Sequence, residues 1–271
     1  MTKFAIYGAP RSGTTWLGEL INASEHVCYK YQPLFSYCLK GALTENSSKE
    51  EIDTFYQKLL LEETDNFLNQ LESRKAGILP SFTKKDITHV GYKEVRYHNL
   101  LPSLLMANKN IKYIFIIRNP IDVLNSWLNA PREFRADLGW KPKEEWRYAR
   151  LKNQDLKHEF NGYEKWKAVA LMYLALAAKY PEQVQLISYK ELLQSTSKQV
   201  KLLYDFLDLK YSQQTKDFIS NRPINKKQQI KSAYSVYKID TKKTIDFSLD
   251  TEAIEYIAGD LKGTTLEQFL K

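Results

Sequence analysis

The sequence has little of several features that would place a protein in a well-marked class. Cysteine is scarce, with only Cys28 and Cys38 in 271 residues. These two are too few for a disulfide framework and have no metal-ligand partners at a recognisable spacing, so free thiols are expected. No apolar run approaches the roughly 18 residues of a membrane span, and no basic-apolar signal region precedes the first expected strand. We therefore expect a cytoplasmic protein without membrane insertion.

Signatures of nucleic-acid binding are also missing, although the formal net charge is +8. Basic patches interleaved with aromatic residues are the usual footprint of such binding. Here the lysines are spread along the chain, and no helix-turn-helix, zinc-finger or RRM pattern accompanies them. A solvated basic surface is the better interpretation, and the charge suits an anionic ligand. No repeat or low-complexity linker divides the chain, so we interpret residues 1–271 as one domain.

The most informative stretch is FAIYGAPRSGTTWLGELI, which covers residues 4–21. A short apolar strand leads into a loop bracketed by Gly8 and Gly13, and apolar residues at helical spacing follow. This layout binds phosphates, because backbone N–H groups and the positive helix end turn toward one point. The loop nearly fits the P-loop pattern GxxxxGK[ST], but Thr14 stands where the lysine belongs and Arg11 places a cation inside the loop. The alternative is a turn whose glycines serve the turn alone.

Alternating strand and helix patterns predict an α/β fold, a three-layer parallel β-sheet with helices on both faces. After the first strand, further strands are expected at residues 26–31, 90–94, 112–117 and 184–189, and a last helix at 251–257. Helical spacing of apolar residues over 50–72 predicts one long helix, with a break near Thr64 as the alternative. It lies in a helical insertion at about residues 40–85. The polar, basic and aromatic segment 130–161 is the candidate substrate loop.

A second motif follows the run KYIFII, which predicts a central strand of the parallel sheet and ends at Arg118. Asn119 is a good helix cap and Pro120 a good first helical residue, so a new helix is expected directly afterwards. Arg118 then lies at the carboxyl edge of the sheet, where its planar fork of donors suits a phosphate. Ser126, two turns into that helix, is placed to face the same anion. The alternatives are a surface ion pair for Arg118 and a helix-surface hydroxyl for Ser126.

The residue type at this strand end also bears on metal binding. Nucleotide hydrolases need an acidic residue near such a strand end to hold magnesium. In this sequence the apolar run is followed by Arg118 instead. We therefore expect no metal requirement.

Together, PRSGTTW and RNPIDVLNS resemble the sulfotransferases that use 3′-phosphoadenosine 5′-phosphosulfate (PAPS). The resemblance is close for these two units and loose for the rest of the chain. It implies a P-loop NTPase-like sulfotransferase fold and PAPS as donor co-substrate. In that family the first loop holds the 5′-phosphosulfate, while an Arg at the strand end and a Ser on the next helix hold the 3′-phosphate. The donor-binding residues implied for this chain are Arg11, Ser12, Gly13, Thr14, Thr15, Trp16, Arg118, Ser126, Tyr189 and Ser232.

Three of these positions depart from the family pattern or have an alternative interpretation. Trp16 matches an aromatic that stacks on adenine in some members, and ordinary packing at a helix start is the alternative. Tyr189, in ISYKEL, resembles the tyrosine of a late-strand YEDL pattern, although Lys190 replaces the acid. Ser232 matches the C-terminal nucleotide loop, but the RKGxxG pattern of the cytosolic branch is missing from the tail.

The resemblance also implies which cations act on the transferred group. Sulfuryl transfer, like phosphoryl transfer, depends on positioning and on cations at the leaving oxygen. Arg11 stands where the family has a Lys or Arg that neutralises the phosphosulfate. Lys93, in VGYKEVRY, matches a lysine that reaches the sulfuryl oxygens in several members. A plain exposed lysine is the alternative for Lys93.

The acceptor's general base must reach its hydroxyl and take a proton near neutral pH. Many relatives have a Glu or His after the second or third strand. Gln32 lies where some have Glu and cannot serve, which leaves Glu94 as the first candidate and His98 as the second. The alternative for Glu94 is an ion pair with Arg96 or a lysine.

The function expected from the sequence is transfer of a sulfuryl group from PAPS to a hydroxyl or amine of a carbohydrate or small-molecule acceptor. Arg11, Lys93 and Glu94 are the predicted catalytic residues. The alternatives are a P-loop-type small-molecule kinase and a nucleotide-binding protein without turnover, which Gln32 keeps open. Neither the acceptor nor the oligomeric state is specified by the sequence.

Overall fold

The computed structural model describes residues 1–220 and 249–270, and a parallel sheet lies at its centre. Its five strands are in the order β2-β3-β1-β4-β5, and every neighbouring pair is parallel. The strands are β1 (Thr2–Tyr7), β2 (Val27–Tyr31), β3 (His89–Glu94), β4 (Ile111–Ile117) and β5 (Val184–Ser188). Each lies close to its predicted bounds, and the predicted α/β fold is confirmed.

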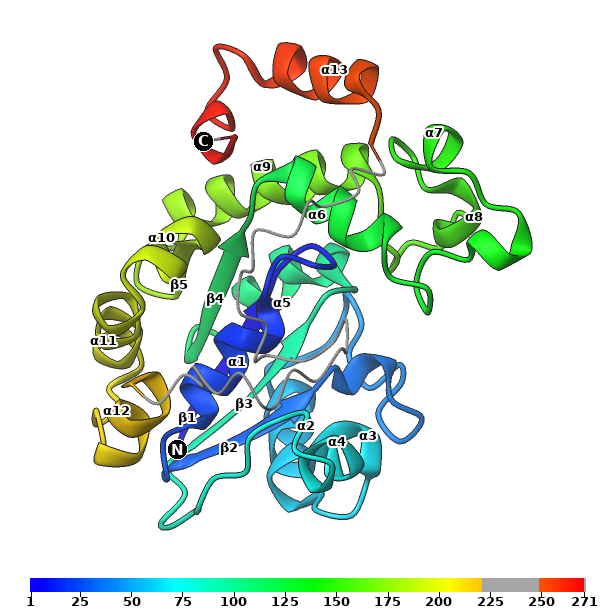
Figure 1. Cartoon of the computed structure of the whole chain (residues 1–271). Coiled ribbons are helices and arrows are strands. Elements are labelled where there is room, and N and C mark those ends of the chain that lie inside the picture. The colour runs from blue at the N-terminus through cyan, green and yellow to red at the C-terminus, as the bar shows by residue number, and fades with distance from the viewer. Residues whose placement is uncertain (221–248, 271) are drawn as a thin grey trace.

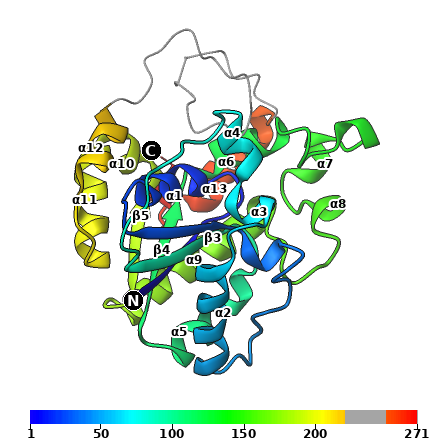
Figure 2. The same cartoon turned by 90° about the horizontal axis from the view of Figure 1, so that it is seen from below.

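Helices cover both faces because the side chains of β1 alternate between two cores. Phe4 and Ile6 pack with Leu17 of α1 (Thr14–Asn22) in one core. Ala5 and Tyr7 belong to the other core, which includes residues of α2 (Lys49–Leu61). Figure 2 shows α1 and α2 on opposite sides of the sheet. The three-layer arrangement thus follows from the alternation of apolar residues in the strands.

The other helices divide between these two faces. The core that contains α1 also takes residues from α11 (Thr196–Leu207) and α12 (Gln213–Ser220). The opposite core takes residues from α5 (Leu101–Ala107), α6 (Pro120–Leu128), α9 (Tyr163–Lys179) and α13 (Thr251–Leu261). Shorter helices are α3 (Asn66–Asn69), α4 (Leu71–Lys75), α7 (Pro142–Glu145), α8 (Arg150–Asn153) and α10 (Tyr189–Gln194). One-turn 3-10 helices are η1 (Pro33–Phe35), η2 (His98–Leu100), η3 (Ala136–Leu138) and η4 (Glu267–Phe269).

The helical insertion contains a break near Thr64, as the alternative interpretation of its sequence expected. Helix α2 ends at Leu61, and the carboxylate of Glu62 accepts hydrogen bonds from the N–H groups of Thr64 and Asp65. Asp65 then caps α3 by accepting from Leu68 N at 2.8 Å. Side-chain bonds to the backbone therefore interrupt the helical pattern, as caps and turns do. The prediction of one continuous helix over 50–72 is wrong, and Figure 1 shows the separate helices grouped beside β2.

Segment 130–161, the expected substrate loop, contains η3, α7 and α8 and has hydrogen bonds between its own residues. Asn153 donates to Asn161 O and accepts from Asn161 N, at 2.9 and 3.0 Å. Glu159 pairs with Arg96, which follows β3, at 2.6 Å. The Glu159–Arg96 pair attaches the segment to the edge of the sheet that carries the predicted site.

Two further expectations concern the thiols and the membrane. Cys28 and Cys38 are free, as expected. Within residues 1–220 and 249–270, no helix combines the length and the apolar character that crossing a membrane requires.

A buried ion pair connects the insertion to α1, the helix that starts at the first loop. Arg74 of α4 holds both carboxylate oxygens of Glu19, at 2.8 and 3.1 Å. The Glu19 side chain is only 1% exposed. Asn22 donates a further bond to the same carboxylate at 3.0 Å.

We predict that Arg74→Met lowers the free energy of unfolding by about 3 kcal/mol, because it leaves the buried Glu19 carboxylate without its cation. Urea unfolding at neutral pH measures the change. Lys49→Met is the matched control, since it breaks an exposed pair with Asp53 and should leave the midpoint unchanged. Equal midpoints for Arg74→Met and the wild type would contradict the prediction.

Candidate active site

The first loop joins β1 to α1 and is packed so closely that its glycines are required. Gly13 has φ of 91°, and a Cβ there would lie 2.3 Å from the ring of Tyr189. A Cβ on Gly8 would lie 2.7 Å from side chains of Ile116 and Thr14. Arg11 also adopts a left-handed conformation, with φ of 70°. The loop is thus fixed against β4 and the start of α10, in a conformation that only particular residues tolerate.

Polar groups of this loop lie buried at the start of α1. Ser12 is 1% exposed, and its Oγ has no hydrogen-bond partner among the described residues. Thr14 is also buried, and no side chain caps the helix at Gly13. Buried polar atoms of proteins are normally paired, so an orphaned hydroxyl at a helix N-terminus indicates a place for an anion.

Arg11 contacts Ser126, although 115 positions separate them in the sequence. Its Nε donates to Ser126 Oγ at 3.0 Å. Its Nη1 donates to Glu133 Oε1 at 3.2 Å and forms an ion pair with that carboxylate. The two predicted donor-binding residues are therefore brought together, and a carboxylate that the sequence did not indicate joins them.

Arg118 lies at the carboxyl end of β4, directly against the first loop. Its Nη1 donates to Arg11 O at 3.1 Å, and its guanidinium lies 4.6 Å from the ring centre of Tyr189. Its Nε is buried without a hydrogen bond in the described part of the chain, and it forms a long ion pair with the exposed Asp122 carboxylate at 3.8 Å. Trp166 Nε1 donates to Arg118 O at 3.1 Å and fixes the backbone. The guanidinium thus keeps donor capacity beside the loop.

The start of α6 follows the predicted capping. Asn119 accepts from Ile121 N at 2.9 Å, and Pro120 is the first helical residue. This turn directs α6 so that Ser126 reaches Arg11.

Lys93 is buried at the end of β3, with 2% of its surface exposed. Its Nζ lies 3.9 Å from the ring centre of Tyr31, and no hydrogen bond or ion pair links it to another described residue. The alternative of a plain exposed lysine is therefore wrong. An unneutralised ammonium in such a place suits an anionic ligand.

Glu94 is fully buried, and it points away from Lys93 because successive strand residues face opposite sides of the sheet. Its Oε1 accepts from Leu34 N at 2.9 Å, while Oε2 has no partner among the described residues. Burial raises the pKa of this carboxyl to about 8, against the opposing effects of the Leu34 N–H, Lys93 and Arg96. The ion pair suggested as the alternative for Glu94 does not form, because Arg96 pairs with Glu159.

His98 and Gln32, the other two residues at the position of the general base, are both buried and hydrogen-bonded. His98 is buried, and its two ring nitrogens contact Tyr173 Oη and Val95 O at 2.9 and 3.1 Å. Burial lowers the pKa of His98 to about 3. This enclosed imidazole is a poor base for an acceptor, so the second candidate is not supported. Gln32 is buried with φ of 42°, and its Oε1 accepts from Arg96 at 3.2 Å.

Three predicted donor-binding residues remain. Trp16 is buried and its ring packs against Phe218 at 5.5 Å, which agrees with ordinary packing at the helix start. Thr15 is half-buried in the first turn of α1. Ser232 lies outside the described residues.

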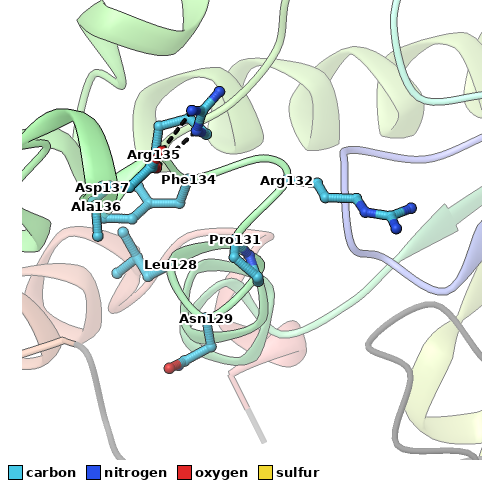
Figure 3. A pocket seen from close by; sticks show the side chains of 8 residues that line it. All are labelled: Leu128, Asn129, Pro131, Arg132, Phe134, Arg135, Ala136 and Asp137. Carbon is cyan, nitrogen blue, oxygen red and sulfur yellow. Dashed lines mark hydrogen bonds and ion pairs between the residues drawn. The ribbon is translucent and has the colours of Figure 1, made fainter.

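A hollow of about 620 Å³ lies beside the end of α6, in the first part of the expected substrate loop. Figure 3 shows Arg135 bonded to Asp137 on one side and Arg132 extending away from the other lining residues. Its lining residues are Leu128, Asn129, Pro131, Arg132, Phe134, Arg135, Ala136 and Asp137. Glu133, the partner of Arg11, is part of the same segment but is not one of the lining residues.

Sequence reasoning missed Glu133 and Tyr31. Glu133 is in an irregular segment with no motif, and nothing in the sequence indicates its contact with Arg11. The contact of Tyr31 with Lys93 could have been predicted once β2 and β3 were taken as neighbours, because the two residues end these strands and are in register. No group of three or more His, Cys, Asp or Glu side chains suited to a metal ion is found in residues 1–220 and 249–270.

Comparison with known families decides the identity of this fold. The model of the sulfotransferase domain matches residues 1–252. The chain belongs to the sulfotransferase family. A comparison with curated protein sequences finds no match.

Solved structures agree with this sulfotransferase fold at low sequence identity. Retinol dehydratase in complex with retinol and PAP is 17% identical with a TM-score of 0.54, over 97% of this chain and 82% of that one. A mouse sulfotransferase in complex with PAP is 16% identical with a TM-score of 0.52, over 99% and 87%. A sulfotransferase from Mycobacterium avium is 14% identical with a TM-score of 0.51, over 98% and 76%.

The raised pKa of Glu94 predicts a particular pH dependence of stability. The carboxyl ionises near pH 4.3 in the unfolded chain and near pH 8 in the folded sulfotransferase domain. Between these values only the unfolded state releases the proton, so this group's contribution to stability falls as pH rises and levels off above pH 8.

We predict that Glu94→Gln, which keeps an acceptor for Leu34 N but cannot ionise, removes this dependence. Urea unfolding of both proteins at pH 5, 6.5 and 8 measures it. The stability of the wild type relative to the variant should fall by up to about 1.4 kcal/mol per pH unit across the window. A constant difference at all three pH values would contradict the buried, protonated state.

Proposed function

We propose that this member of the sulfotransferase family transfers a sulfuryl group from PAPS to a hydroxyl or amine of a carbohydrate or small-molecule acceptor. The observation that carries the proposal is the convergence of Arg11, Ser126 and Arg118. Arg11 reaches Ser126 at 3.0 Å, and Arg118 donates to the Arg11 carbonyl at 3.1 Å. Two guanidinium groups and a helix N-terminus therefore face one region at the carboxyl edge of the sheet.

The unpaired donors of this region fit an anionic donor such as PAPS. Ser12 Oγ and Arg118 Nε are buried without hydrogen-bond partners among the described residues. The ammonium of Lys93 is buried over a ring and has no carboxylate partner there. Desolvated donors in such numbers are costly unless an acceptor joins them. A molecule with both a phosphosulfate and a separate phosphate supplies acceptors for all of them.

The proposed assignment follows the positions of these groups. Residues Arg11 to Thr15 would hold the 5′-phosphosulfate, and Arg118 with Ser126 the 3′-phosphate. Tyr189, which contacts both Gly13 and Arg118, lies beside the nucleotide. Two of the similar structures contain PAP, the desulfated form of this donor, which supports the assignment.

The proposed chemistry depends on charge and on proton transfer. Bound PAPS supplies the sulfuryl group and a phosphate leaving group. Arg11 and Lys93 place positive charge around that region, which is the main contribution a protein makes to such transfers. Glu94 is the proposed base, and with a pKa of about 8 it is mostly protonated at pH 7. Its proton-accepting fraction therefore grows as pH rises toward 8.

The acceptor is proposed to be a small molecule or a carbohydrate. One similar structure, retinol dehydratase, contains retinol together with PAP. This supports a small-molecule acceptor for the family fold but does not specify one for this chain.

Nucleotide preference tests the donor. We predict that adenosine 3′,5′-bisphosphate at about 100 times its Kd raises the melting temperature by about 5 °C, whereas ATP with magnesium does not. Arg118→Ala should abolish the shift, because it removes the donors for the 3′-phosphate. Arg118→Lys keeps the positive charge but lacks the planar pair of guanidinium donors, so this variant should show only part of the wild-type shift in melting temperature. A shift with ATP and magnesium alone would favour a kinase.

A second experiment tests whether Arg11 acts on turnover rather than on nucleotide affinity, in contrast to Arg118. We predict that Arg11→Ala lowers the turnover number by about 100-fold or more and changes the affinity for adenosine 3′,5′-bisphosphate less than threefold, because that product has no sulfuryl group. Labelled PAPS with a panel of phenols and glycans measures turnover, and calorimetry measures affinity. Unchanged turnover would remove Arg11 from the catalytic assignment. Tight binding without transfer to any acceptor would favour a nucleotide-binding protein.

A further inference from the structure

Lys93 is held in an unusual way for a buried lysine. The other buried lysine of the described residues, Lys30, has oxygen partners, and its Nζ donates to Asn69 Oδ1 at 2.6 Å. Lys93 instead has the face of Tyr31 at 3.9 Å and no oxygen partner among the described residues. This difference requires a physical explanation, because a desolvated ammonium without acceptors is costly.

The ring of Tyr31 attracts the ammonium without occupying its hydrogen atoms. A cation over an aromatic face is held by the quadrupole of the ring. A lysine has three N–H donors, and those that do not point at the ring stay available to oxygen acceptors. A carboxylate in the same place would neutralise the charge and accept one or more of these bonds, as Glu133 does for Arg11.

The strand register and a contact with Phe67 hold the Tyr31 ring in place. Tyr31 and Lys93 are aligned in the register of β2 and β3, so their side chains share one face at the ends of the strands. The Tyr31 ring also makes a T-shaped contact with Phe67, with centres 5.5 Å apart and planes at 80°. Phe67 belongs to α3, which the Lys30–Asn69 bond fastens to β2. The helical insertion thus supports the ring that supports the lysine.

We propose that Tyr31 is a positioning residue for sulfuryl transfer, whose ring holds the Lys93 ammonium at the donor site while leaving N–H groups of that ammonium for the sulfuryl oxygens. The inference rests on the proposed function, since it takes the sulfuryl group as the ligand of Lys93. It also assigns a role to the insertion, which supplies Phe67 as a packing partner of the ring.

The test compares Tyr31→Leu, which removes the ring, with Tyr31→Phe, which keeps it. Calorimetry measures the affinities for PAPS and for adenosine 3′,5′-bisphosphate. Tyr31→Leu should weaken PAPS binding about tenfold and leave bisphosphate binding unchanged, because only PAPS carries the sulfuryl group. Tyr31→Phe should bind both as the wild type does. In a Lys93→Met background, Tyr31→Leu should have no further effect.

A second readout needs no nucleotide. Acetylation of the ligand-free protein by acetic anhydride, followed by mass spectrometry of the peptide with Lys93, reports how well the amine is held. Tyr31→Leu should speed this labelling several-fold, and Tyr31→Phe should not. Phe206→Leu is the matched control, because Phe206 lies under Lys112 at 4.8 Å near the amino end of β4, away from the donor site. It should leave PAPS affinity and Lys93 labelling unchanged.

The outcomes separate the inference from the proposed function. Wild-type affinity and labelling in Tyr31→Leu would overturn the inference, as would equal losses in Tyr31→Phe or the same loss in the Lys93→Met background. A wild-type protein that binds neither PAPS nor the bisphosphate would contradict the proposed function. In that case, unchanged Lys93 labelling in Tyr31→Leu would also overturn the ring contact, and faster labelling would retain the contact without the sulfuryl ligand.

Discussion

The close packing of the first loop against the sheet is the constraint on which the site depends. Gly13 lies against the ring of Tyr189, and Gly8 against β4, with no room for a side chain at either position. Because Arg118 donates to the carbonyl of Arg11, the loop and the end of β4 are also joined by a charged hydrogen bond. The candidate donor-binding groups of the first loop, the end of β4 and the start of α10 therefore take their relative positions from steric contact and this hydrogen bond.

The cations at this edge of the sheet are stabilised in different ways. Arg96, which lies toward β2, has a largely buried carboxylate partner in Glu159. Lys93 instead lies over the ring of Tyr31, with no carboxylate partner among the described residues. An aromatic face stabilises a cation without neutralising it, so the positive charge of Lys93 is kept where the proposed donor binds.

Most of the fold could be predicted from the sequence, because apolar runs and caps are local signals. KYIFII formed β4, an inner strand of the sheet, and Asn119 and Pro120 directed α6 as their residue types predict. The contact of Arg11 with Ser126 was not predicted, since the sequence motif grouped Ser126 with Arg118. The contact of Glu133 with Arg11 and the complete burial of Glu94 could not be predicted in this way. Glu133 is in a segment without periodic pattern, and the burial of Glu94 depends on how η1, which contains Leu34, packs against β3.

The ion pair between Arg11 and Glu133 has a consequence for the energetics of binding. An anion that reaches this guanidinium meets a group that already has a partner, so binding at Arg11 is an exchange between two anions. The measured affinity then reports a difference between the ligand and the carboxylate, and the segment that carries Glu133 contributes to that difference. A second ligand that binds this segment would therefore change the affinity for the donor. By thermodynamic linkage, the donor would change the affinity for that second ligand by the same factor.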